Sequence, residues 1–271
     1  MASFADAATA RPAVADFFRT LADDTRLSIL RLLARSDRKA GELGSALSLP
    51  SNAVSYHLKH LRTLGLLSDH RSGADARDVY YRLDVDQLAR LYAAAGAALH
   101  PGLSAFSTAP DGQPHSRTVP TRRLRVLFLC TNNSARSQLA EALMRHMGGD
   151  FVAVASAGSA PTEVHPDALT VLREWRIDAS GLAAKPLERF VGQAFDYIIT
   201  VCDRVRDHCP TFPGDPEPIH WSMLDPAVVE DPDRRLAAFR DVARELQTRI
   251  RYLLILPHPV TGARFTLPNI Q

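Results

Sequence analysis

A cysteine in the middle of the chain stands in a setting that could activate it. Cys130 ends the apolar run VLFLC, five small or polar residues follow, and Arg136 and Ser137 precede a segment with helical spacing. Backbone N–H groups of a loop that enters a helix converge on one point and bind anions, and an arginine adds a planar two-pronged donor. We therefore predict an oxyanion-binding loop with Cys130 as its nucleophile.

The same positive potential predicts a pKa for Cys130 below the value of about 8.5 for a free thiol. The oxyanion should be held by the loop residues that follow the thiol, which are Thr131, Asn132, Asn133, Ser134, Ala135 and Arg136. A Cys-x5-Arg-Ser pattern is modest evidence alone and needs a strand before it and a helix after it.

Strands and helices alternate around this loop, which predicts an α/β domain with an open parallel sheet. Strands are expected at 125–130, 151–158 and 196–202, and helices at 137–148, 165–177 and 233–255. The cysteine loop then lies at the carboxyl end of the first strand, which is where open α/β sheets bind ligands.

The first part of the chain has a different pattern, mostly helical with one β-hairpin. Helices separated by a short turn at 48–52 precede two alternating strands at 66–71 and 79–83, which is the element order of a winged helix-turn-helix. Polar side chains on the second helix and the hairpin could reach DNA bases and phosphates; they are Ser51, Asn52, Ser55, Tyr56, His57, Lys59, Arg71 and Arg77. The competing interpretation is a small helical domain with a solvated polar face.

Length and composition fit a multidomain protein. The 271 residues suffice for two domains, and we place a DNA-binding domain at 1–100, a Pro- and Ser-rich linker at 101–123, an α/β domain at 124–256 and a tail at 257–271. No apolar run reaches the roughly 18 residues needed to span a membrane. The N-terminus lacks a basic region followed by an apolar one, so we expect a cytoplasmic protein with no membrane partner.

The segments LADDTRLSILRLL, GELGSALSLPSNAVSYHLKHLRTLGLL and VYYRL resemble the ArsR/SmtB family of metal-responsive repressors. The resemblance implies binding of operator DNA by a homodimer, paired through the regions Asp16–Leu21 and Leu88–Leu99. Members often hold thiophilic ions on cysteines near the first helix of the motif. The corresponding stretch DRKAGELG has no cysteine, so no metal site is expected.

The segments CTNNSARS, SAG at 156–158 and HWSMLDPA resemble low-molecular-weight tyrosine phosphatases and the arsenate reductases that share their fold. The resemblance implies that Asp225 is the general acid. An ordinary Asp-Pro turn is the alternative for that residue. The catalytic residues would then be Cys130, Arg136, Ser137, Cys202, Cys209 and Asp225.

The other two cysteines favour reduction over hydrolysis. An odd number of cysteines argues against a disulfide framework, although three buried apolar thiols are the alternative. The stretch CDRVRDHCP resembles the resolving segment of thioredoxin-coupled arsenate reductases. The resemblance implies that Cys130 forms an adduct with arsenate, that Cys202 displaces arsenite, and that Cys209 forms a disulfide with Cys202 for thioredoxin to reduce.

The spacing of the two resolving cysteines restricts the conformation of the segment between them. In a helix, residues seven apart are separated by about 10.5 Å along the axis. A disulfide needs Cα atoms within about 7 Å. The segment 203–209 must therefore unwind or loop out when Cys202 and Cys209 pair.

Two positions depart from the family pattern. Asn132 stands where a glycine is usual, and asparagine is the best other residue for a positive φ. Some relatives bind potassium through residues that match Asn133, Glu141, Ser156 and an acid. Lys185 occupies the place of that acid and could pair with Glu141, so we expect no bound cofactor and no use of potassium.

The leading hypothesis is therefore a transcriptional regulator fused to a thioredoxin-dependent arsenate reductase. A tyrosine phosphatase fused to a regulator is the first alternative, because a phosphatase needs only Cys130. The second is a repressor whose non-catalytic C-terminal domain senses metalloids or redox state through Cys202 and Cys209.

Overall fold

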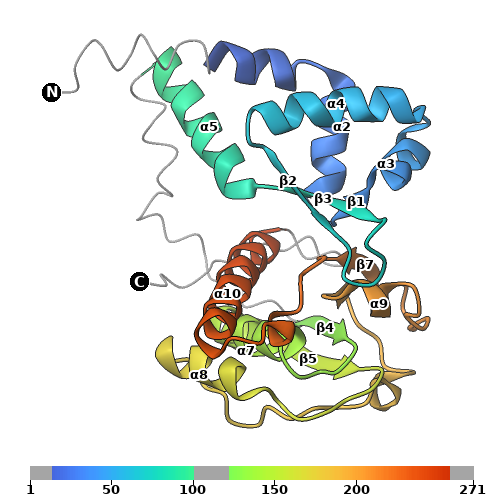
Figure 1. Cartoon of the computed structure of the whole chain (residues 1–271), viewed down its shortest axis with the longest axis vertical. Coiled ribbons are helices and arrows are strands. Elements are labelled where there is room, and N and C mark those ends of the chain that lie inside the picture. Colours follow the sequence, from blue (N-terminus) through green and yellow to red (C-terminus); the bar gives the residue numbers. More distant parts are fainter. Residues whose placement is uncertain (1–13, 101–121, 257–271) are drawn as a thin grey trace, which may run out of the picture. The chain divides into compact units, whose positions relative to one another are not determined.

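The computed structural model describes residues 14–100 and 122–256 (Figure 1). Contacts divide these residues into two compact units, the first holding most of 14–100 and the second holding 122–256. Most of the predicted linker and all of the predicted tail lie outside the described residues, so the domain boundaries remain predictions.

The first unit is mostly helical and contains one small sheet. After a helix at 14–21 come α2 (Asp24–Leu33), β1 (Arg38–Lys39), α3 (Ala40–Leu47), α4 (Ser51–Thr63), β2 (Leu67–Arg71), β3 (Val79–Leu83) and α5 (Val85–Leu99). The strands pair antiparallel in the order β1-β3-β2. This is the predicted winged helix-turn-helix. The strand β1 was not predicted, because a strand of two residues is too short to show a sequence pattern.

Apolar side chains at helical spacing hold this unit together. Leu43 of α3 and Val54, Leu58 and Leu61 of α4 are buried in one cluster with Leu33 of α2. The turn between α3 and α4 passes through Ser48, which has a φ of 55°. The buried stripe of α4 turns its polar side chains away from the core.

The second unit is a four-stranded parallel sheet with helices. Its main elements are β4 (Leu124–Cys130), α7 (Arg136–Gly148), β5 (Val152–Gly158), α8 (Pro166–Glu174), β6 (Tyr197–Thr200), α9 (Asp203–Arg206), β7 (Glu217–His220) and α10 (Pro232–Leu254). Short 3-10 turns lie at Gly149–Phe151, Leu187–Phe190 and Pro226–Val228. The strand order is β5-β4-β6-β7, which confirms the predicted open parallel sheet.

The central strand β4 brings the predicted nucleophile to the end of the sheet. From Val126 to Cys130 every residue of β4 is buried, and β4 pairs with β5 on one side and with β6 on the other. The fourth strand, β7, was not predicted, because the sequence EPIH is short and contains a proline. Strand β6 ends at Thr200, two residues earlier than expected.

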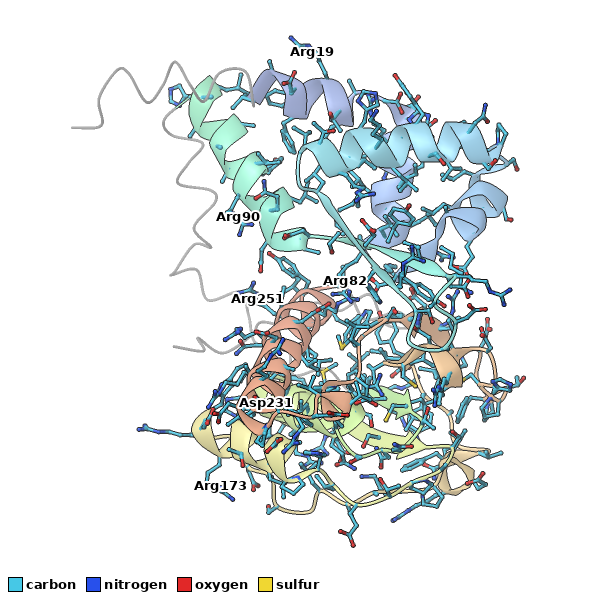
Figure 2. The ribbon with its side chains drawn as sticks, viewed as in Figure 1. Arg19, Arg82, Arg90, Arg173, Asp231 and Arg251 are labelled. Carbon is cyan, nitrogen blue, oxygen red and sulfur yellow. The ribbon has the colours of Figure 1, made fainter. Side chains whose placement is uncertain are left out.

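The longest helix, α10, packs against α7 and α8. Its N-cap Asp231 accepts a hydrogen bond from the backbone N–H of Arg234 at 2.9 Å, and Figure 2 places Asp231 and Arg251 at its two ends. This arrangement puts acidic charge at the positive end of the helix dipole and basic charge at the other. Within 14–100 and 122–256, no helix combines the length and apolarity that a bilayer crossing requires.

Candidate active site

The loop from Cys130 to Arg136 wraps around the thiol. The backbone N–H of Asn133 donates to Cys130 Sγ at 3.1 Å, and Ser137 Oγ lies 2.9 Å from the same sulfur. The Cys130 side chain is only 2% exposed. The predicted strand, loop and helix around the thiol are all present.

Hydrogen bonds on the outside of the loop orient its peptide groups. The carbonyls of Thr131, Asn132 and Ser134 accept bonds from the N–H groups of Ala160, Thr162 and His165 at 2.9 to 3.0 Å. A trans peptide points its N–H opposite to its carbonyl. The N–H groups of residues 132, 133 and 135 therefore point toward the thiol side, where an oxyanion would bind.

Asn133, and not Asn132, is the residue that takes the left-handed conformation. Its φ is 45°, and its amide nitrogen donates to Ser137 Oγ at 2.9 Å and to Ser156 Oγ at 2.8 Å. Its amide oxygen accepts from the backbone N–H of Lys185 at 2.7 Å. The expectation of a positive φ at Asn132 is wrong, because these side-chain bonds require the turn one residue later.

A glycine on the neighbouring strand lets the loop approach. A Cβ on Gly158 would lie 2.4 Å from the carbonyl oxygen of Thr131 and 2.8 Å from the backbone nitrogen of Asn133. Such contacts are too short for carbon, so only glycine fits at the end of β5. The SAG segment thereby fixes the shape of the cysteine loop.

Arg136 reaches across the mouth of the loop to the predicted general acid. Its NH2 group donates to Asp225 Oδ2 at 2.6 Å, and its NH1 group donates to the carbonyl of Met223 at 2.9 Å. Arg136 Nε is buried and has no acceptor among the described residues. The guanidinium is thus held in place and keeps a donor for an incoming oxyanion.

Burial raises the pKa of the Cys130 thiol, although the Arg136 charge and the Ser137 and Asn133 hydrogen bonds act in the opposite direction. The expectation of a lowered pKa is therefore wrong. The physical reason is that the thiol is buried, and burial disfavours the charged thiolate by more than the Arg136 charge and the two hydrogen bonds favour it.

This raised pKa predicts the pH dependence of alkylation at Cys130. In a Cys202→Ser/Cys209→Ser variant, reaction with iodoacetamide should still accelerate as the pH passes about 8.5, the ordinary thiol value. The thiolate is the reactive form, and its fraction grows until the pH exceeds the pKa. Stopped-time alkylation with mass spectrometry measures the rate, and a plateau near neutral pH would contradict the structure.

The second cysteine lies beside the loop that holds the first. Cys202 follows β6, whose residue Thr200 pairs with Leu129 of β4, and its sulfur lies 3.4 Å from Thr131 Oγ1. Cys202 is 3% exposed. Cys130 and Cys202 are therefore brought together at the carboxyl ends of neighbouring strands.

Cys209 lies beyond the end of a short helix. The helix α9 covers only Asp203–Arg206, so the segment between the two cysteines is not a continuous helix. Cys209 is partly buried, and burial raises the pKa of its thiol.

Lys185 pairs with a buried carboxylate behind the loop. Its Nζ donates to Glu141 Oε2 at 3.0 Å, and the same oxygen accepts from Ser156 Oγ at 2.6 Å. Arg145 pairs with the other carboxylate oxygen of Glu141 at 2.5 Å. Through Ser156 this cluster connects to Asn133, so a cation at Lys185 supports the cysteine loop.

In the first unit, the structure places the candidate DNA-contacting residues mainly on the outer surface. Seven of the eight candidates are exposed: Ser51, Asn52, Ser55, Tyr56, Lys59, Arg71 and Arg77. His57 is partly buried, and its Nδ1 lies 3.7 Å from Asp23 Oδ1, so it belongs to the edge of the face. Sequence reasoning missed His60, which is exposed and packs edge-on against Tyr56 with ring centroids 4.6 Å apart.

These features define two classes of module in one chain. The first unit is a winged helix-turn-helix, and the second is an α/β domain that presents a cysteine in the loop between a strand and a helix. Residues 23–69 match the bacterial regulatory protein, arsR family, and residues 125–258 match the low molecular weight phosphotyrosine protein phosphatase family.

Several similar proteins are named arsenate reductases. One from Halalkalibacterium halodurans is 37% identical over 127 residues, which are 46% of this chain and 91% of that protein. A glutaredoxin arsenate reductase from Synechocystis is 33% identical over 131 residues, or 48% of this chain and 95% of that protein. The solved thioredoxin-dependent arsenate reductase of Corynebacterium glutamicum is 27% identical, with a TM-score of 0.39, and its alignment covers 83% of this chain and 94% of that one. Through residues 125–258 the chain belongs to the low molecular weight phosphotyrosine protein phosphatase family, in its arsenate reductase group.

Proposed function

We propose that the chain is a bifunctional transcriptional regulator and thioredoxin-dependent arsenate reductase. The observation that carries the reductase part is the position of Cys202, whose sulfur lies 3.4 Å from Thr131 Oγ1 in the loop that holds Cys130. A hydrolase has no use for a second thiol at that place.

The first step of the proposed reaction forms a bond between sulfur and arsenic. The N–H groups of residues 132, 133 and 135 and the guanidinium of Arg136 bind the arsenate oxygens. The Cys130 thiolate attacks the arsenic atom, and a hydroxyl group of the arsenate takes a proton from Asp225 and leaves as water. Ser137 stays hydrogen-bonded to the sulfur of Cys130.

The second and third steps form a Cys130–Cys202 disulfide and transfer it to the Cys202–Cys209 pair. The Cys202 thiolate attacks Cys130 Sγ, the electron pair of the S–As bond passes to arsenic, and arsenite leaves as arsenic goes from As(V) to As(III). Cys209 then attacks Cys202, which frees the Cys130 thiolate and leaves a Cys202–Cys209 disulfide. A thioredoxin dithiol reduces that disulfide by the same exchange chemistry.

The decisive experiment couples arsenate to the consumption of NADPH through thioredoxin reductase and thioredoxin. We expect consumption to depend on arsenate, on thioredoxin and on the intact chain. Because one similar protein is named a glutaredoxin arsenate reductase, a parallel assay with glutaredoxin and glutathione separates the two reductants. Absence of arsenate-dependent turnover with both systems would refute the reductase proposal.

A protein tyrosine phosphatase is the second candidate. It is favoured by the pairing of Arg136 with Asp225, since the same loop and acid suit phosphate ester hydrolysis. Hydrolysis would require Cys130 alone, so the resolving cysteines decide between the two functions.

For the first unit we propose binding of operator DNA by a homodimer. Exposed apolar side chains support the dimer: Tyr92 and Leu99 of α5 are 70% and 68% exposed, and Phe18 is 42% exposed. The exposed polar face of α4 supports DNA binding. Measurement of the oligomeric state of the full chain with Tyr92→Glu tests the proposed dimer surface, and an unchanged dimer would contradict it.

Lys59 provides a test of the DNA-binding proposal. With a duplex selected by the full chain from a random library, Lys59→Ala should weaken binding and lower the salt slope by about one for each phosphate that is no longer neutralised. Arg244→Ala, an exposed change in the other unit, is the control and should leave both quantities unchanged. Equal salt slopes for Lys59→Ala and the parent would show that Lys59 does not contact a DNA phosphate.

Potassium should have no effect on arsenate turnover, because the Lys185 ammonium already neutralises Glu141. Steady-state rates are compared in potassium and sodium chloride at equal ionic strength. A clear stimulation of the parent by potassium would refute the proposal. In Lys185→Asp, which removes the built-in cation, we expect slower turnover that becomes sensitive to potassium.

A further inference from the structure

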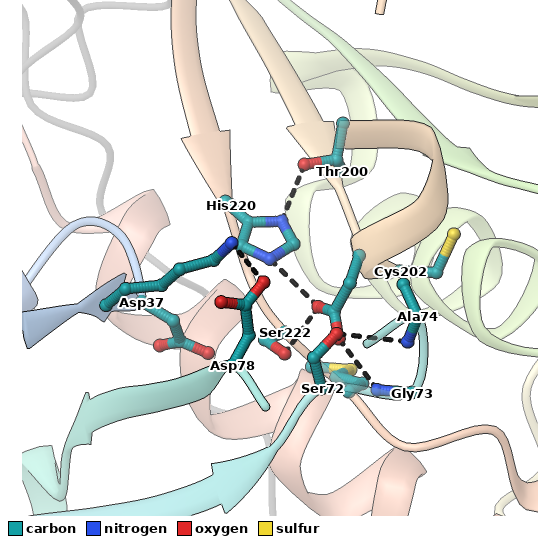
Figure 3. A network of polar contacts seen from close by, with 12 residues as sticks. Asp37, Ser72, Gly73, Ala74, Asp78, Thr200, Cys202, His220 and Ser222 are labelled. Atoms are coloured by element: carbon teal, nitrogen blue, oxygen red, sulfur yellow. Dashed lines mark hydrogen bonds and ion pairs between the residues drawn. The ribbon is translucent and has the colours of Figure 1, made fainter. Parts of the chain in front are cut away.

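A network of polar side chains lies directly behind Cys202, and the steps proposed above do not use it. Asp203, the residue after the thiol, accepts a hydrogen bond at Oδ1 from Ser222 Oγ at 2.6 Å and pairs there with His220 Nε2 at 3.1 Å. The other ring nitrogen, Nδ1, lies 2.8 Å from Thr200 Oγ1. Figure 3 shows the network with Thr200, Cys202, His220 and Ser222 labelled.

The charge state of the network follows from these contacts. Burial raises the pKa of the Asp203 carboxyl, but its hydrogen bonds, with those from His220 and Ser222 the largest, outweigh burial and hold the pKa well below its usual value. Asp203 is therefore a carboxylate at neutral pH. A carboxylate can only accept hydrogen bonds. His220 therefore carries a proton on Nε2 and donates a hydrogen bond from it to Asp203.

The network connects the residue after Cys202 to two parts of the sheet. Thr200 and His220 are direct partners in the β6–β7 ladder, and both ring nitrogens of His220 are engaged. The side chains of His220 and Ser222 are almost fully buried. Asp203 is thus fixed by hydrogen bonds that involve a charge, which are stronger than neutral ones.

At the far end of the same segment, Cys209 lies outside the helix. The helix α9 ends at Arg206, and Cys209 is partly buried, with a thiol contact of 3.7 Å to the carbonyl of Pro210. For a Cys202–Cys209 disulfide to form, one of the two cysteines must move. The fixed end at Asp203 leaves that motion to the residues after it.

We propose that Asp203 and His220 are positioning residues for the resolving thiol. They hold the backbone at Cys202 so that its sulfur stays beside the Cys130 loop, and they make Cys202 the fixed partner to which Cys209 moves. This inference rests on the proposed function for its role in turnover, but the positioning itself can be measured without arsenate.

The first experiment measures positioning through disulfide equilibrium. In a full-length Cys209→Ser parent, oxidised glutathione converts the Cys130 and Cys202 thiols to a disulfide and yields two reduced glutathione molecules. The equilibrium constant reports how well the two sulfurs are placed. Asp203→Ala should lower it roughly tenfold or more, the usual effect of losing a hydrogen bond to a charged group. Asp203→Asn, which keeps an acceptor oxygen for His220, should recover most of the loss.

The second experiment measures the same disulfide during a single turnover with saturating arsenate, in the same Cys209→Ser parent. Asp203→Ala should slow formation of the Cys130–Cys202 disulfide about tenfold, with little change in the arsenate concentration that gives half the maximal rate. A parent that forms no disulfide with arsenate would refute the proposed function. In that case, the equilibrium with glutathione alone would test whether Asp203 positions Cys202.

Two further variants separate positioning from general destabilisation. His220→Gln keeps a donor near the place of Nε2 and should resemble the parent, whereas His220→Ala should resemble Asp203→Ala. Thermal unfolding of each variant is measured beside the equilibrium constant. Parent-like equilibrium constants in Asp203→Ala and His220→Ala would overturn the inference. Equal losses in the alanine, asparagine and glutamine variants would also overturn it, because restored hydrogen bonds would then have no effect.

Discussion

Replacing Arg136 with lysine is expected to lower kcat/KM for arsenate about 100-fold or more, the usual effect of losing a donor to a developing oxyanion. Lysine keeps the charge but loses the planar fork that holds Asp225 and Met223 at the same time. It also removes the buried Nε donor that has no acceptor among the described residues. Steady-state rates over a range of arsenate concentrations measure the effect.

The matched control for this substitution is Arg240→Lys. Arg240 of α10 also binds a carboxylate through two nitrogens, at 2.6 and 2.9 Å from Glu174, but lies on the surface away from the cysteine loop. An exposed ion pair contributes little, so Arg240→Lys should leave kcat/KM unchanged. A similar small effect in both variants would exclude Arg136 from oxyanion binding.

Burial explains why the predicted direction of the Cys130 pKa was wrong. The pattern correctly placed a guanidinium beside the thiol, because both residues border one strand-loop-helix turn. It could not show that the folded domain leaves this thiol only 2% exposed, so that burial outweighs the guanidinium.

Local sequence patterns predicted most helices and strands. They could not predict contacts between side chains that are far apart in the sequence. Apolar runs and the alternation of strands and helices were enough for β4, β5, β6 and the winged helix-turn-helix. The choice of Asn133 over Asn132 for the positive φ depends on bonds to Ser156, which is on another strand. The bond from His220 to Asp203 likewise depends on β7, a strand of four residues that carries no apolar alternation.

The two resolving cysteines should give different failures when each is replaced by serine. Cys202→Ser is expected to lower arsenate turnover by about 1000-fold or more, since removing a member of a catalytic unit has effects of this size. Among the described residues, no other thiol lies at the end of β6 to attack Cys130. Arsenite release, measured by chromatography after a rapid acid quench, should fall below one equivalent per chain.

Cys209→Ser should instead release one equivalent of arsenite and then stop. Cys202 can still attack Cys130, but thioredoxin, the reductant in this assay, does not open the resulting disulfide, because Cys130 and Cys202 are both buried and a protein dithiol needs an accessible sulfur. Mass spectrometry of the quenched chain should find Cys130 joined to Cys202. The double serine variant should lose reduction and retain any hydrolysis of phosphate esters. Full arsenate turnover in either single variant would refute the cascade, and phosphate ester hydrolysis as the only activity of the parent would favour the phosphatase.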